Sequence, residues 1–183
     1  MKALIVKYKS VIKFIGTFLV VYIGLSVAYK FYLQFSDGSK FYPDYITHLV
    51  AKQCELLLNT FGYNAKVLAH TNEPSMKLML NELYLARVIE GCNSISVIIL
   101  FVSFVIAFSG QVKDTLLFVL SGSVLLYTVN LLRIVLLSMG MYHFPENSNF
   151  LHAVVFPGII YGMVFLLWMF WVNRFSKLNK KNE

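Results

Sequence analysis

TLLFVLSGSVLLYTVNLLRIVLLSM, residues 115–139, is an apolar run long enough to cross the hydrocarbon core of a bilayer, which takes about 20 helical residues. Its single charged side chain is that of Arg133. Further apolar runs at 11–31, 92–109 and 150–172 indicate an integral membrane protein, although the run at 92–109 is short for a span. We therefore expect an all-α bundle of about four transmembrane helices.

The composition agrees with a chain that is embedded in a lipid bilayer. Of its 183 residues, 58% are hydrophobic, whereas soluble domains are usually about 45–50% apolar. The net charge of +7 comes from Lys and Arg that cluster at the termini, beside the spans. This placement is typical of a topology signal, and we expect no nucleic-acid partner. At this length, residues 1–183 form a single membrane domain.

The distribution of charge predicts the topology. Basic residues lie before the first span, after the last span and in the short loop 110–114, whereas the loop 140–149 contains neither Lys nor Arg. Because cytoplasmic loops are enriched in these residues, both termini should be cytoplasmic. The loop 140–149 and the segment 36–91 should then be external. In a bacterium, this arrangement places a multi-pass protein in the cytoplasmic (inner) membrane.

The external segment 36–91 should begin with an amphipathic helix. From Pro43 to Phe61, apolar residues recur near helical spacing. We expect Pro43 in the first turn of this helix and Gly62 at its end. The helix should lie on the membrane surface or cap the bundle.

A small β-hairpin should follow this helix. Residues 64–70 read as one strand, 71–75 as a turn, and 76–89 as one or two further strands on partial alternation. The hairpin leads directly into the stretch Glu90-Gly91-Cys92-Asn93-Ser94.

Cys92 is the candidate nucleophile. It precedes the second apolar run, with N-cap chemistry offered by Asn93 and Ser94. In the first turn of a helix, the dipole favours the thiolate, the form that attacks carbonyl groups. The alternatives are a small buried residue or a disulfide with Cys54, the other external cysteine.

Arg133 is the candidate fixed cation. It lies six residues before Met139, about 9 Å from the external end of its span. A charge at such depth usually faces the interior of a bundle and serves function, while the alternative is a side chain that extends to the boundary. Asn130, three residues earlier on the same helical face, should orient the guanidinium or bond across helices.

His152 is the candidate acid and base, because imidazole titrates near neutral pH. It begins the fourth span at the external boundary, and His143 in the preceding loop is its competitor. The His and Cys residues lack metal-ligand spacing, so we expect neither a metal nor another cofactor. Cys92, Arg133 and His152 should share one boundary layer of the membrane.

The sequence Glu90-Gly91-Cys92-Asn93-Ser94, the Asn130-x-x-Arg133 pair and His152 in the following span together resemble the exosortase/archaeosortase family. The compact form is most similar to the exosortase F branch. One departure is Ser94, where many members have glycine.

The resemblance implies a membrane-embedded cysteine transpeptidase or protease with its active site at the external face. Its substrates would be exported proteins with a C-terminal sorting signal, made of a motif, a hydrophobic span and a basic tail. The external hairpin could pair with the extended cleavage motif as an added strand. Cys92 would be the nucleophile, Arg133 the group that stabilises the oxyanion or the substrate, and His152 the acid and base.

Other residues carry weaker expectations. Glu90 either orients His152 or, as we favour, is a solvated carboxylate at the boundary. Gly158 and Gly162 allow close helix contact, which we expect to serve packing within the bundle rather than docking of a substrate helix.

The alternative function is a non-catalytic membrane assembly subunit that binds the helix of a co-encoded partner through Arg133. A small transporter is disfavoured because the chain has no inverted repeat. A redox role is disfavoured because the chain has no Cys-x-x-Cys motif.

Overall fold

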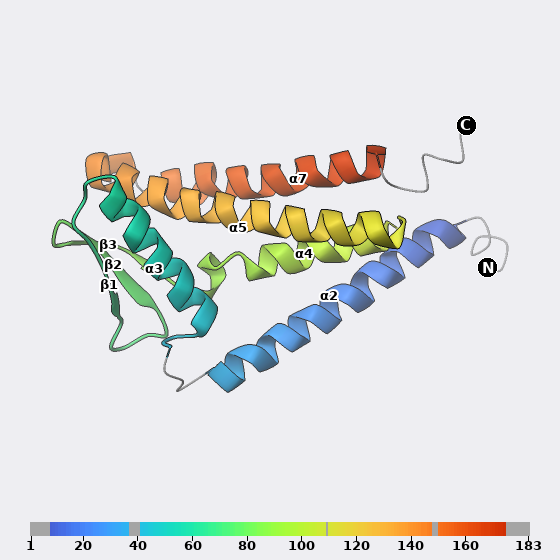
Figure 1. Cartoon of the computed structure of the whole chain (residues 1–183), viewed down its shortest axis with the longest axis horizontal. Helices are drawn as coiled ribbons and strands as arrows, with labels where there is room; N and C mark the ends of the chain where they lie inside the picture. The colour runs from blue at the N-terminus through green and yellow to red at the C-terminus, as the bar shows by residue number, and fades with distance from the viewer. Residues whose placement is uncertain (1–7, 37–40, 109, 148–149, 175–183) are drawn as a thin grey trace.

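The computed structural model describes residues 8–36, 41–108, 110–147 and 150–174, except for the side chains at positions 147, 151, 152 and 156. Three long apolar helices and one shorter helix form a bundle, and a small sheet covered by a helix lies at one end (Figure 1). The elements in chain order are α2 (Lys9–Ser36), α3 (Tyr45–Thr60), β1 (Ala65–Ala69), β2 (Met76–Leu80), β3 (Leu83–Val88), η1 (Glu90–Cys92), α4 (Ile95–Ala107), α5 (Val112–His143), η2 (Pro145–Asn147), η3 (Leu151–Val155) and α7 (Phe156–Arg174).

The expected all-α membrane fold is confirmed, with one correction to its spans. Helices α2, α5 and α7 are long and apolar enough to cross a membrane. The run at 92–109 is helical over a shorter range than expected: a short 3₁₀ turn ends at Cys92, and α4 has 13 residues. At 1.5 Å per residue, α4 is about 20 Å long, short of a hydrocarbon core of about 30 Å.

The helices alternate in direction. α2 and α5 run toward the sheet, whereas α4 and α7 run away from it (Figure 1). The start of α2 and the end of α7 therefore lie at the end of the bundle opposite the sheet. Along its length α2 packs mainly on α4, and α4 packs in turn on α5 and α7.

Helix α3 starts later than its sequence indicated. Asp44 is its N-cap: the carboxylate Oδ1 accepts hydrogen bonds from the backbone N–H groups of Ile46 and Thr47, both at 3.0 Å. Pro43 therefore lies before the helix and not in its first turn. Gly62 follows the last turn with φ of +88°, a conformation that favours glycine and ends a helix.

The predicted strands are present as a three-stranded antiparallel sheet in the order β1-β2-β3. Leu80 pairs with Leu83 across a two-residue turn in which Asn81 and Glu82 both have positive φ, as the right-handed twist of a hairpin requires. The partner residues of β2 and β3 shift by one at Leu85, which marks a β-bulge.

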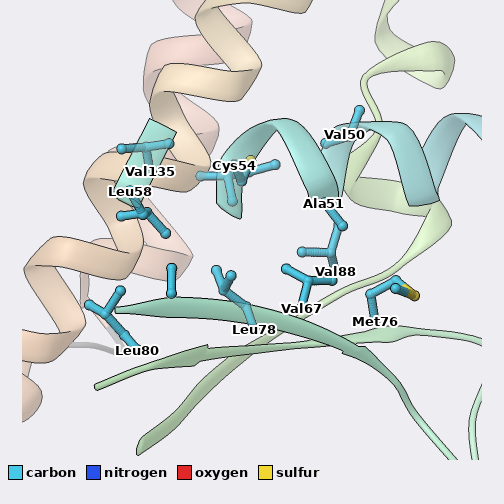
Figure 2. Close-up of a cluster of buried hydrophobic side chains, with 12 residues drawn as sticks. Val50, Ala51, Cys54, Leu58, Val67, Met76, Leu78, Leu80, Val88 and Val135 are labelled. Carbon is cyan, nitrogen blue, oxygen red and sulfur yellow. The ribbon is translucent and has the colours of Figure 1, made fainter. Parts of the chain in front are cut away.

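Helix α3 caps the bundle by packing between the sheet and α5. Alternate residues of β2 are buried, so one face of the sheet meets α3. Figure 2 shows this core, whose labelled members are Val50, Ala51, Cys54, Leu58, Val67, Met76, Leu78, Leu80, Val88 and Val135. The core connects the sheet to the C-terminal half of α5.

Gly122 sets how closely α4 approaches α5. A Cβ atom added there would lie 2.4 Å from Cζ of Phe101, a ring that is completely buried and cannot swing away. We expect Gly122→Ala to lower the unfolding free energy in detergent by about 1–3 kcal/mol, because overpacking forces the helices apart. Thermal melting of the solubilised protein measures this.

Gly158→Ala is the matched control, since a Cβ there would meet nothing within 4 Å. Its melting temperature should stay unchanged or rise slightly. Equal destabilisation by both substitutions would contradict the close contact at Gly122.

Candidate active site

Cys92 lies at the junction between the sheet and the membrane helices. Its backbone N–H donates to the carbonyl of Ile89 at 2.8 Å, which closes the 3₁₀ turn directly after β3. The thiol is partly buried and free. The sequence placed Cys92 in the first turn of a helix, and this is wrong: α4 begins three residues later, at Ile95. The dipole of α4 therefore does not act on Cys92 as a first-turn residue.

Asn93 anchors this junction from three sides. Its side chain is completely buried, and Oδ1 accepts a hydrogen bond from the backbone N–H of Ile95 at 3.0 Å. Its Nδ2 donates to the hydroxyl of Tyr29 on α2 at 2.7 Å and to Oγ1 of Thr47 on α3 at 3.1 Å. Asn93 is therefore not the N-cap of α4, which is Ser94, but it accepts the N–H of the first residue of α4 and fixes the residue after the thiol against two other helices.

Ser94 does not act as a capping side chain. It has φ of 66°, in the left-handed region, and its hydroxyl donates to the carbonyl of Asn93 at 2.6 Å. Left-handed backbone favours glycine, so a glycine would also suit this position. The departure at Ser94 is accommodated by this local hydrogen bond.

Asn130 joins Cys92 to Arg133. Its Nδ2 donates to the backbone carbonyl of Cys92 at 2.7 Å, across 38 positions of sequence. Its Oδ1 accepts from Nη1 of Arg133 at the longer distance of 3.4 Å. Asn130 is buried, so the amide cannot rotate freely between other partners. It therefore fulfils both expectations at once: it bonds across helices and contacts the guanidinium.

Arg133 has spare hydrogen-bonding capacity and spare charge. Its Nε atom is buried and lacks a hydrogen-bond partner among the described residues. Within the same ranges, the only ion pairs are Lys52 with Glu55 and Arg87 with Glu73. Among the described residues, Arg133 therefore has no acidic partner, and its guanidinium can bind an anionic or hydrogen-bond-accepting group of a ligand.

Cys92 and Arg133 line the same cavity. Its volume is about 190 Å³, and its walls are mostly apolar. Besides these two residues, the cavity is lined by Leu85, Ala86, Arg87 and Val88 of β3, and by Ile134, Leu137, Ser138 and Met141 of α5. A thiol and a cation therefore face one apolar space, which suits attack on an uncharged amide followed by stabilisation of negative charge.

Of the two candidate histidines, the structure describes the side chain of His143 but not that of His152. His152 belongs to η3, a π-helical turn that packs against α5 and leads into α7, and its side chain lies outside the described residues. Its role remains a prediction. His143 bonds through Nε2 to the hydroxyl of Tyr63 at 2.8 Å. It lies ten residues beyond Arg133 on α5, about 15 Å along the axis, so it is a poor competitor for the site.

Glu90 lines a second, wider cavity of about 910 Å³. This cavity is shared with Lys30, Glu73 and Arg87, and Arg87 lines both cavities. Glu90 is exposed, as expected of a solvated carboxylate, and its orientation of His152 remains a prediction. Among the described residues, no group of three or more His, Cys, Asp or Glu could hold a metal ion.

The two cysteines do not form the disulfide that sequence left open, since both thiols are free. Cys54 is fully buried in the core between α3 and the sheet, with Cys92 packed at its edge. Burial first, and the neighbouring Cys92 second, raise the pKa of the Cys54 thiol to about 12. Cys54 is therefore a structural residue with little thiolate at neutral pH.

We expect a water-soluble maleimide at pH 8 to label Cys92 and spare Cys54 in the folded protein. With a pKa of about 12, only about one Cys54 thiol in ten thousand is ionised at this pH. Mass spectrometry of the digested protein measures both sites. Cys92→Ala should leave the folded protein unlabelled until denaturant exposes Cys54, and labelling of folded Cys54 would contradict its burial.

Sequence reasoning missed Tyr29, Thr47 and the β3 residues that line the cavity. The signal for Tyr29 was weak because one tyrosine in an apolar span reads as an interfacial residue. The sequence predicted a hairpin that could pair with a substrate segment, but it did not indicate that the third strand would be the one beside Arg133.

A family model described as transmembrane exosortase (Exosortase_EpsH) matches residues 11–171. The matched range covers nearly all of α2 and α7 and the whole chain between them, and it includes Cys92, Asn130, Arg133 and His152. No curated protein and no solved structure matches the chain.

Proposed function

Because this chain belongs to the transmembrane exosortase family, we propose that it cleaves the C-terminal sorting signal of exported proteins through Cys92, Arg133 and His152. Family membership indicates a membrane transpeptidase that acts in protein sorting. The residue roles, the substrate signal and the external location of the site are parts of the proposal, and so is the resemblance to the F branch.

The observation that carries the proposal is the shared cavity of Cys92 and Arg133. Cys92 and Arg133 are 41 positions apart in the sequence. Asn130 bonds to the backbone carbonyl of Cys92 and to the side chain of Arg133. A cation that is costly to bury in a membrane span, with Nε unpartnered among the described residues, is typical of a functional group awaiting its ligand.

The proposed reaction has two steps. The Cys92 thiolate attacks the scissile carbonyl, and the guanidinium of Arg133 stabilises the resulting oxyanion. The C–N bond then breaks, His152 gives a proton to the leaving amine, and the released fragment is the hydrophobic span with its basic tail. The remaining thioester passes its acyl group to water or to an amine-bearing acceptor, which restores the thiol.

Helix α7 offers a surface for the substrate's own membrane helix. Both Gly158 and Gly162 are exposed, and a Cβ at either position would meet nothing within 4 Å. Our preferred expectation, packing within the bundle, is therefore wrong for the described residues. Small residues on an outward face allow close approach of another helix, and this supports docking of the substrate beside α7.

The proposed orientation puts the sheet and Cys92 outside the bacterial inner membrane and both termini in the cytoplasm. The alternating helix directions and the lysine-rich ends of the chain support this orientation.

The experiment that tests the function follows an exported protein that ends in a hydrophobic span and a basic tail. Its processing is compared, by mass and by blotting, in cells that carry the wild-type enzyme or a variant at Cys92. Retention of the uncut anchor specifically in the Cys92 variant is the result that the proposal requires.

A further inference from the structure

Strand β3 has one free edge. In the order β1-β2-β3 it is an outer strand, and among the described residues β2 is its only hydrogen-bonded strand neighbour. A free edge presents a row of unpaired backbone N–H and C=O groups, which readily pair with another chain. The outer end of β3 is open to solvent, since Leu83 and Tyr84 are 57% and 52% exposed.

This edge borders the cavity that holds Cys92. The cavity is lined by four consecutive β3 residues, 85–88. Successive side chains of a strand point to opposite faces, so a cavity against one face would touch every second residue. Val88 is buried in the core beneath α3, whereas Arg87 is exposed and pairs with Glu73. A space that meets both of these neighbours therefore lies along the backbone edge of the strand.

We infer that the free edge of β3 binds the substrate's cleavage segment as an added, parallel β-strand, an inference that rests on the proposed function. The occupant is the extended stretch of the exported protein just before its membrane helix. Strand addition of this kind draws its affinity from main-chain hydrogen bonds and its specificity from the pockets that receive alternate side chains.

The direction follows from the connectivity. β3 runs toward Cys92 and continues through η1 into α4, which enters the bundle. The substrate chain likewise runs from its exported part into its membrane helix. A substrate strand beside β3 is therefore parallel to it, and its carboxyl end reaches Cys92.

The α5 side of the cavity provides the matching side-chain pocket. Ile134 and Leu137 are buried apolar residues that face the cavity opposite β3. They would receive one apolar substrate side chain close to the scissile bond, while the backbone remains hydrogen-bonded to the strand edge.

Crosslinking in membranes tests this geometry. In a Cys54→Ala, Cys92→Ser background, a thiol is introduced by Ala86→Cys or Arg87→Cys, both on the cavity-lining part of β3 after the bulge. The probe is the uncut form of the exported protein that the wild-type enzyme cleaves. It is made as a series of variants, each with a single cysteine at one of the successive positions before the cleavage point. The cleavage point comes from the mass of the wild-type product, and a short bifunctional thiol reagent joins neighbouring cysteines.

Each β3 thiol should select one substrate position, with a yield roughly tenfold above its neighbours because strand pairing fixes the local concentration of the partner. Moving the enzyme thiol from 86 to 87 should shift the preferred position one residue toward the cleavage point. Leu68→Cys is the matched control, because Leu68 is exposed on β1, the opposite edge strand. This variant should give only the background yield at every position.

The outcomes separate the two proposals. In one outcome, the wild type cleaves the substrate while the crosslinking yields from the β3 thiols are as uniform across substrate positions as those of the β1 control. This result would overturn strand addition and leave the catalytic function standing. A shift away from the cleavage point would overturn the parallel alignment. If the wild type leaves the anchor uncut, the proposed function fails and strand addition fails with it.

Discussion

Cys92→Ala should abolish cleavage of the anchored substrate, with a loss of at least about 10⁴-fold, because removal of a nucleophile leaves only the binding and oxyanion contributions. The variant should still accumulate in the membrane, since the thiol is only partly buried and its replacement opens little space in the core. Cleavage is measured as the ratio of cut to uncut substrate over time, with the enzyme quantified in the same membranes.

Cys54→Ala is the matched control for this result. It removes the other thiol of the chain, which is fully buried and does not line the catalytic cavity. Its effect should be confined to stability, and processing per folded enzyme should stay close to that of the wild type. This comparison separates loss of the nucleophile from loss of a cysteine.

Unchanged processing by Cys92→Ala would overturn the catalytic proposal. The assembly-subunit alternative would then come first, since it requires a silent Cys92 and an essential Arg133. Co-purification of a membrane partner with the wild type, lost in Arg133→Ala, would establish that alternative.

Arg133→Ala should reduce processing by about 10²–10³-fold, the range observed when one oxyanion donor is removed from other enzymes. The loss should appear in the rate at saturating substrate. Failed insertion should not explain it, because removing a charge from a membrane span makes that span easier to insert. Arg133→Lys should recover part of the rate, since it keeps the charge and loses the planar fork of donors.

Arg87→Ala is the control for this prediction. Arg87 lines the same cavity, but its guanidinium is already paired with Glu73. Its removal should change the rate by less than about tenfold, as for an exposed ion pair. Equal losses at the two arginines would argue against a specific role for Arg133 and for a general electrostatic effect of the cavity.

Several features of the fold could be predicted from sequence because they depend on residues close together in the chain. Apolar runs predict helices α2, α5 and α7, since the free energy of transfer into lipid is summed along one continuous segment. Alternation predicts the strands, and Gly62 marks the end of α3 for a local backbone reason. The placement of Asn130 on the same helical face as Arg133 is likewise a consequence of helical spacing.

Boundaries set by side-chain bonds were harder to predict. After Ser94 the run to residue 109 carries no charge and only three serines, so its hydropathy alone did not mark where the helix begins. Its helix begins at Ile95 because Asn93 is held by Tyr29 and Thr47, residues from two distant helices. Likewise, Asp44 and not Pro43 opens α3, because its carboxylate satisfies two free N–H groups.

The sequence by itself indicated an integral membrane protein and the residue types at the ends of its apolar segments, and the family resemblance it supported is confirmed. Only the tertiary structure decided that Cys92 and Arg133 line one cavity, that Asn130 connects them, and that the edge of β3 borders it. Helix and strand formation are governed by neighbours in the chain. A cavity depends on packing between segments far apart in sequence, and no local pattern encodes that packing.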